Sequence, residues 1–123
     1  MEFISKDSIT SLHNPGVVSR QLLCPENAPG ARATITEVHL APGGCQPRHT
    51  HPASEQTWVA LRGAGRLLLA DGQEAPFSAG DVVRFAEGDV HGLVNNGGGE
   101  LVYLSVTAPP LSFAGAYERA ELP

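Results

Sequence analysis

The sequence is poor in the features that mark several classes of protein. It has only 2 cysteines, too few for a disulfide framework, so we expect Cys24 and Cys45 to be free thiols. Its 8 basic residues are outnumbered by 13 acidic ones, which leaves no basic surface for nucleic acid or anionic lipid. No apolar run approaches the roughly 20 residues that span a bilayer, and no secretion signal opens the chain. We therefore expect a cytoplasmic protein that binds neither nucleic acid nor a membrane.

Short, evenly spaced strand signals fill most of the chain. Its 123 residues suit one domain, and its 14 glycines and 10 prolines favour strands joined by turns over a helical bundle. Asp71-Gly72 predicts a tight hairpin turn. Apolar runs bounded by turn residues predict strands at 17–23, 33–40, 56–61, 65–70, 82–85, 91–95 and 101–106. This pattern is typical of an all-β sandwich or barrel.

Three histidines and a glutamine fall in two patterned runs. The first run reads Gly43, five residues, His49-Thr50-His51, four residues, Gln56, six residues and Gly63. The second run reads Gly80, five residues, Ala86-Glu87-Gly88, two residues, His91, three residues and Asn95.

The spacing of these four residues suits a metal site. Side chains two apart on a strand share a face, with Cα atoms about 6 to 7 Å apart, so His49 and His51 can converge on one ion. His91 and Gln56 lie on separate predicted strands, which a closed antiparallel barrel can bring together. Imidazole nitrogens and amide oxygens both bind small divalent metals. We therefore predict one metal site inside a β-barrel, formed by His49, His51, Gln56 and His91.

The two runs resemble the paired motifs of the cupin superfamily, G(x)5HxH(x)3–4E(x)6G and G(x)5PxG(x)2H(x)3N. The chain departs from them at Gln56, where the family usually has Glu, and at Ala86, where it usually has Pro. The resemblance implies a single-domain cupin-type double-stranded β-helix, or jelly-roll barrel, over residues 17–107, between an N-terminal arm (1–16) and a C-terminal tail (108–123). It also implies a divalent transition metal (Mn, Fe, Ni or Zn) and a homodimer, in which the tail could contact the partner.

Gln56 and its neighbour Glu55 compete for the fourth ligand position. Alternation puts them on opposite faces of one strand, so only one can face the ion. The motif register favours Gln56, through its amide oxygen, whereas Glu55 would bind only after a small bulge. Neutral imidazoles and a neutral amide would leave the ion its full charge, which favours an acidic or enolisable small substrate.

Four further residues are candidates for the pocket wall. Trp58 shares the face of Gln56, although a purely structural Trp in the core fits the pattern as well. Tyr103 and Phe85 have weaker claims of the same kind. Arg48 flanks the first motif and could bind a substrate carboxylate, although an Arg at a strand end is more often solvated.

These residues together predict a small metal-binding cupin, in the leading interpretation an enzyme of the dioxygenase or isomerase/lyase type. One cupin subfamily with the same His-His-Gln-His pattern opens and ketonises unsaturated uronates. Its last strand carries an Asp and an aromatic residue where this chain has Ser105 and Thr107, so that activity is not carried over. No general base is evident beyond the ligands, which favours a second interpretation, a cupin that binds or senses a small molecule without turnover.

Overall fold

The computed structural model describes residues 1–123 and confirms an all-β chain. Three short 3-10 turns, η1 (Lys6–Ser8), η2 (Ala70–Gly72) and η3 (Ala114–Ala116), are its only helical elements. No helix has the length and apolar character needed to cross a bilayer. The strands are β1 (Thr10–Asn14), β2 (Val17–Leu23), β3 (Thr34–Leu40), β4 (Cys45–His49), β5 (Glu55–Arg62), β6 (Ala64–Leu69), β7 (Glu74–Ser78), β8 (Val82–Phe85), β9 (His91–Val94), β10 (Leu101–Ala108) and β11 (Arg119–Glu121).

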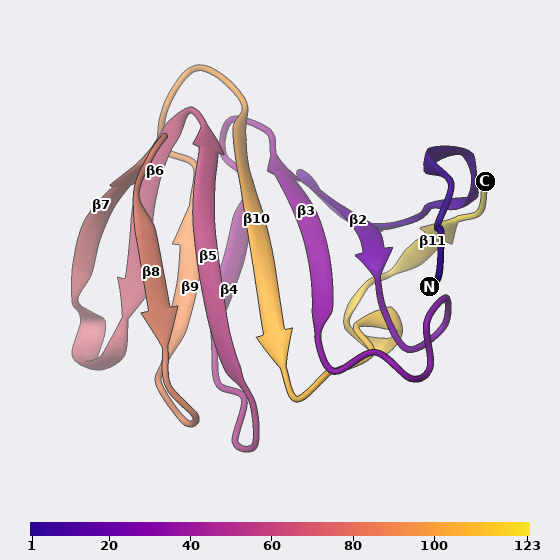
Figure 1. Cartoon of the computed structure of the whole chain (residues 1–123). Coiled ribbons are helices and arrows are strands. Elements are labelled where there is room, and N and C mark those ends of the chain that lie inside the picture. The colour runs from indigo at the N-terminus through magenta and orange to yellow at the C-terminus, as the bar shows by residue number, and fades with distance from the viewer.

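Two antiparallel sheets face each other and enclose the core (Figure 1). The larger sheet has the order β11-β1-β2-β3-β10-β5-β8, and the smaller has the order β4-β9-β6-β7. Strand β3 alternates strictly between buried and half-buried residues, as expected for a strand with one face toward a core. The largest fully buried side chains lie between the sheets and include Trp58, Tyr103, Phe77, Leu40 and Leu93.

All seven strands predicted from the sequence are present, with ends shifted by at most two residues. The Asp71-Gly72 turn is also confirmed. Both residues have positive φ, 58° and 71°, and they join β6 to β7, which pair antiparallel. Left-handed conformations at both positions suit the right-handed twist of the flanking strands.

Strands β4 and β7 escaped prediction because each contains a proline. Pro47 lies in β4 and Pro76 in β7, and both strands are at the edges of the smaller sheet. An edge strand tolerates proline because one side of it needs no hydrogen bonds from the sheet. The expectation that His49 and His51 share a strand is wrong, since β4 ends at His49 and His51 lies in the loop before β5.

The arm and the tail extend the larger sheet. Strand β1, from the arm, pairs with β2, and β11, from the tail, pairs with β1. Figure 1 shows both termini at this edge of the molecule. The tail therefore folds back onto its own chain, and the homodimer expected from the family resemblance stays a prediction.

Candidate metal centre

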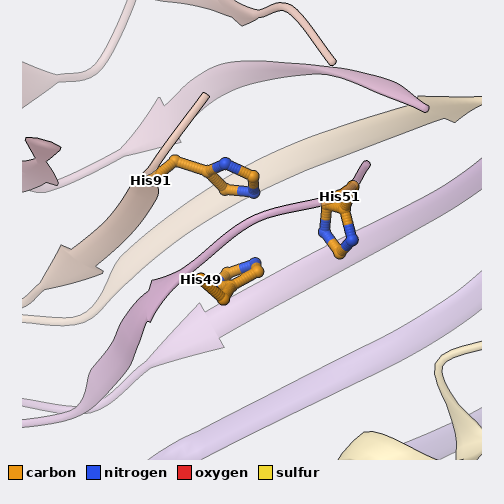
Figure 2. A group of neighbouring side chains, drawn as sticks. All are labelled: His49, His51 and His91. Atoms are coloured by element: carbon orange, nitrogen blue, oxygen red, sulfur yellow. The ribbon is translucent and has the colours of Figure 1, made fainter. Parts of the chain in front are cut away.

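The three motif histidines come together at one end of the barrel. His49 ends β4 and His91 begins β9, and the two residues are direct partners across these paired strands. The loop carrying His51 is held beside them, because the His51 carbonyl accepts a hydrogen bond of 2.9 Å from Gly88 N, in the turn before β9. One ligand atom from each ring lies within 4.8 Å of the other two. Figure 2 shows the rings facing a common space.

Backbone carbonyls fix which nitrogen of two rings carries the proton. Nδ1 of His49 lies 2.7 Å from the Pro47 carbonyl oxygen, and Nδ1 of His91 lies 2.8 Å from that of Asp89. A carbonyl oxygen can only accept, so each Nδ1 donates and each Nε2 keeps its lone pair. Nε2 of His91 is buried and has no hydrogen-bond partner. An unpaired buried acceptor next to two more imidazoles is the arrangement that a bound cation would satisfy.

The surroundings of His51 and His91 keep these two rings uncharged. The pKa of His91 is lowered from 6.5 to about 4, mainly by burial; the hydrogen bond to Asp89 acts in the opposite direction, and the neighbouring His49 and His51 add to the lowering. His91 also stacks on Phe85, with ring centroids 4.6 Å apart. Burial, and then the neighbouring His49, lower the pKa of His51 as well. Neutral imidazoles at pH 7 are the form that binds metals, so the donor set fits a divalent ion.

Gln56 lies beside the histidines with its amide held on two sides. Its Oε1 accepts from Nε1 of Trp58 at 2.8 Å, and its Nε2 donates to Oγ1 of Thr107 at 2.8 Å. An indole N–H can only donate, so the amide oxygen must face Trp58. The amide nitrogen then faces the site, 3.5 Å from Nε2 of His51. Ligation through the oxygen, as expected from the sequence, requires the amide to rotate from this position and stays a prediction.

Glu55 lies on the opposite face of β5. Its carboxylate accepts from Nε of Arg84 at 2.7 Å on the outer surface. Strands β5 and β8 pair without a register shift from Gln56 onward, so no bulge turns Glu55 toward the histidines. The geometry thus keeps Glu55, the alternative fourth ligand, away from the imidazoles.

A cavity of about 430 Å3 opens in front of His49 and His51. Of the four expected pocket residues, Trp58 and Tyr103 line it. Phe85 lies behind the wall, packed against Trp58 and His91. Arg48 turns away, because its guanidinium donates to the backbone carbonyls of Leu69 and Gln73. The expectation that Arg48 contacts a bound ligand therefore has no support in this geometry.

The tail supplies pocket residues that the sequence analysis missed. Phe113, Ala116 and Tyr117 line the cavity. The Tyr117 hydroxyl accepts from Nε2 of Gln46 at 3.0 Å, which ties the tail to β4 across the opening. The only sequence signal was two aromatic residues after a Pro-Pro break, and nothing local indicates which surface they cover.

The protein is a jelly-roll barrel of two facing sheets, with a histidine cluster at one end. These features place it among small β-barrel proteins that can hold a metal. The family model for the cupin domain matches residues 36–107, more than half of the chain. The chain therefore belongs to the cupin family, as the motifs predicted.

Comparisons with individual proteins agree on the fold. Tetracenomycin polyketide synthase protein TcmJ of Streptomyces glaucescens is 24% identical over 94 residues, which are 76% of this chain and 62% of TcmJ. The structure of the polyketide cyclase RemF from Streptomyces resistomycificus has a TM-score of 0.73 at 23% identity, covering 99% of this chain and 84% of RemF. A predicted oxalate decarboxylase from Thermotoga maritima has a TM-score of 0.74 at 23% identity, covering 89% of this chain and 99% of that one.

Proposed function

We propose that this protein is a metal-dependent cupin enzyme, in which His49, His51 and His91 bind a divalent transition metal and the adjoining cavity holds a small enolisable or acidic substrate. The observation that carries the proposal is the approach of three imidazole nitrogens to within 4.8 Å of one another. Two of these rings have a pKa lowered by burial, so both stay neutral at pH 7 without help from the ion.

The ion, when bound, would supply Lewis-acid chemistry, or redox chemistry if it is iron. The chain's own part is to bind and orient. Backbone carbonyls of Pro47 and Asp89 hold two rings in the tautomer that presents Nε2 to the ion. Manganese, iron, nickel and zinc all accept imidazole ligands, and the reaction stays within the isomerase/lyase or dioxygenase types.

Gln56 has a separate role in this proposal. Its amide oxygen is committed to Trp58, so its N–H groups are what it offers to the site. One N–H is held by Thr107, and the other points at Nε2 of His51. If His51 held the ion through that nitrogen, Nε2 would no longer accept, and the amide hydrogen would be free to donate to an oxygen of the substrate. A donor of this kind stabilises negative charge that develops on an enolate.

The names of the similar proteins support the substrate class. Polyketides carry ketones that enolise, and oxalate is a small acid; a polyketide cyclase and a predicted oxalate decarboxylase share this fold. At 23% identity the likeness shows the fold alone. The substrate class therefore rests on the charge of the donor set and is only supported by these names.

One observation favours a second function, the binding of a small molecule without turnover. No carboxylate, lysine or arginine is among the residues that line the cavity. General acid–base catalysis by a side chain would then fall to the histidines, which the metal already uses.

Metal binding by matched variants tests the proposal. The apo-protein should take up one equivalent of Zn²⁺ or Mn²⁺ in calorimetry. Loss of an outer-shell partner typically weakens metal binding about 10- to 100-fold, so loss of the direct ligand in His51→Ala should cost at least about 100-fold. His39→Ala, on the outer face of β3, is the control and should bind like wild type. Equal binding by the two variants would contradict the site.

Turnover then separates the two functions. Metal-loaded protein is incubated with β-diketones and with sugar acids, and products are followed by chromatography. Product that disappears in His51→Ala supports the enzyme. Tight binding with no product over hours supports the binding protein.

A further inference from the structure

The cavity wall contains no acidic or basic side chain other than the motif histidines His49 and His51. Sixteen residues line it, and none is Asp, Glu, Lys or Arg. The polar ones among them are amides and hydroxyls, and four aromatic side chains complete the wall: Trp58, Tyr103, Phe113 and Tyr117. The chain has 21 charged residues, so an uncharged cavity is a distinct feature of it. The lack of charge restricts which molecules can bind there.

Three charged residues near the first motif are engaged outside the cavity. Arg48 donates to two backbone carbonyls, and Glu55 pairs with Arg84 on the outer face. None of these three is free to neutralise a charge on a bound molecule. The ion proposed above would be the only strong positive charge in the cavity.

The sheet wall of the cavity carries several hydroxyl groups, among them those of Ser105 and Thr36. Ser105 of β10 and Thr36 of β3 are direct cross-strand partners, and both line the cavity. The neighbouring Ser19 hydroxyl already accepts from Gln21, and the Thr107 hydroxyl accepts from Gln56. Ser105 and Thr36 can therefore hydrogen-bond a neutral hydroxyl or carbonyl group of a ligand, but they cannot neutralise a carboxylate or phosphate.

An anion far from the ion would lose its hydration without gaining a counter-charge. Burying an unpaired charge is much more costly than burying a neutral polar group that finds a hydrogen bond. A volume of about 430 Å3 lies in the range of small-molecule sites, and aromatic walls favour a planar ligand.

We infer that the cavity selects by charge. Its ligand is a planar, ring-sized compound whose only acidic group is the enolisable group at the ion, and whose remainder is neutral. Sugar phosphates, and acids with a second carboxylate away from the ion, are rejected. This inference rests on the proposed metal site and narrows the substrate class given above.

A matched pair of probes tests the charge selection. Benzoylacetone carries an enolisable diketone on a neutral phenyl ring, and para-carboxybenzoylacetone adds one carboxylate at the far end. Both are titrated into Zn²⁺-loaded protein and into apo-protein by calorimetry. Benzoylacetone should bind the loaded protein at least about tenfold more tightly than its carboxylated analogue, because only the analogue buries an unpaired anion.

Two arginine substitutions in η3 sharpen this test. Ala116 is exposed and lines the cavity, whereas Ala114 is exposed in the same turn and does not line it. Ala116→Arg places a cation at the opening and should tighten binding of the carboxylated probe at least about threefold, with no gain for benzoylacetone. Ala114→Arg should change neither affinity.

The possible results distinguish this inference from the proposed function. If the protein takes up no metal, the proposed function fails and this inference falls with it. If metal binds but the carboxylated probe binds as tightly as benzoylacetone, or neither probe binds, only the inference is overturned. An equal gain in Ala114→Arg and Ala116→Arg would also overturn it, because the effect would then come from net charge.

Discussion

The two faces of the larger sheet carry different chemistry although the same strands build both. Along β3, Thr36 and Val38 are buried on the inner face. Between and beside them, Glu37 and His39 lie on the outer face, and Glu37 accepts from Arg20 at 3.0 Å and from His39 at 2.7 Å. The inner face presents hydroxyls, amides and aromatic rings, while the outer face presents ion pairs.

The difference shows in two histidines of this one chain. His39 has a carboxylate on each side, with Nε2 toward Glu37 and Nδ1 toward Glu100. That contact with His39, and then Arg20, hold the pKa of Glu37 below its usual value. His91 has a backbone carbonyl, an aromatic ring and two other imidazoles around it. Both nitrogens of His39 face carboxylates, whereas Nε2 of His91 has no partner in the fold. Strand β9 of the smaller sheet places His91 in the interior, so the side of the sheets on which a histidine lies decides its chemistry.

The largest difference in stability between substitutions on the two faces is expected for Trp58, on the inner face, and Thr57, on the outer face. Trp58 is 1% exposed and contacts Tyr103, Phe85 and Phe77 through their rings. Trp58→Ala should lower the free energy of unfolding by about 3 to 5 kcal/mol, through lost burial and the cavity left behind. Thr57→Ala, on the outer face one residue away, should cost less than about 1 kcal/mol. Urea unfolding followed by circular dichroism measures both, and similar losses would contradict the comparison.

The next largest effect is a dependence of stability on pH that comes from His91, which is buried in the interior. The pKa of His91 is about 4 in the folded chain and 6.5 ordinarily. Between these values the unfolded chain binds the proton and the folded chain does not. Stability of the apo-protein should therefore be lost as pH falls from about 6.5 to about 4, by roughly 3 kcal/mol in all.

Two variants test whether His91 is the main cause of that pH dependence. His91→Phe removes the group with the larger shift and keeps a ring against Phe85, so its urea midpoint should change clearly less between pH 6.5 and 4.5 than that of the wild type. The remainder comes from His51, whose pKa is also lowered by burial. His39→Ala removes a histidine from the outer face instead, and as the control it should not abolish the loss of stability between pH 6.5 and 4.5. An unchanged slope in His91→Phe would show that another group is responsible.

The sequence predicted those parts of the molecule that depend on local spacing. The fold class and seven strands follow from periodicity, and the approach of His49, His51 and His91 follows from motif spacing. The tail escaped prediction because Phe113 and Tyr117 reach the cavity through contacts with residues some 60 to 70 positions away in the chain, such as Gln46. Local patterns carry no information on such pairings.

The role of Gln56 shows a finer limit of sequence reasoning. Motif register placed the side chain on the correct face, where it is 4% exposed. Which amide atom faces the site depends on Trp58, whose indole N–H takes the oxygen. The indole N–H of Trp58, two residues away in the strand, thus decides whether the Gln56 amide acts as a metal ligand or as a hydrogen-bond donor. The spacing of the motif residues cannot show this.

Substitutions at Gln56 should have effects of intermediate size. Gln56→Leu leaves the Trp58 N–H and the Thr107 hydroxyl without their partner and should cost about 1 to 3 kcal/mol of stability. If the amide acts as a donor, Zn²⁺ affinity should fall less than threefold, because no ligand is lost. Gln56→Glu should instead raise Zn²⁺ affinity, since a carboxylate can accept from Trp58 and also bind the ion. Calorimetry of both variants measures these affinities. A drop in Zn²⁺ affinity of a hundredfold or more in Gln56→Leu would show that the amide oxygen is the fourth ligand.

The smallest effect is expected on the outer face of the same strand, at the pair between Glu55 and Arg84. Both side chains are largely solvated, with 42% and 63% of their side-chain surface exposed. Exposed ion pairs contribute about 0 to 1 kcal/mol and are weakened further by salt, so Glu55→Gln and Arg84→Gln should each lower stability by no more than this. Zn²⁺ affinity should be unchanged in both variants, because Glu55 faces away from the imidazoles. A marked loss of Zn²⁺ binding in Glu55→Gln alone would mean that the carboxylate reaches the ion in solution. The separation between an uncharged inner face and a charged outer face would then fail at Glu55, next to the position where the family motif usually has a carboxylate.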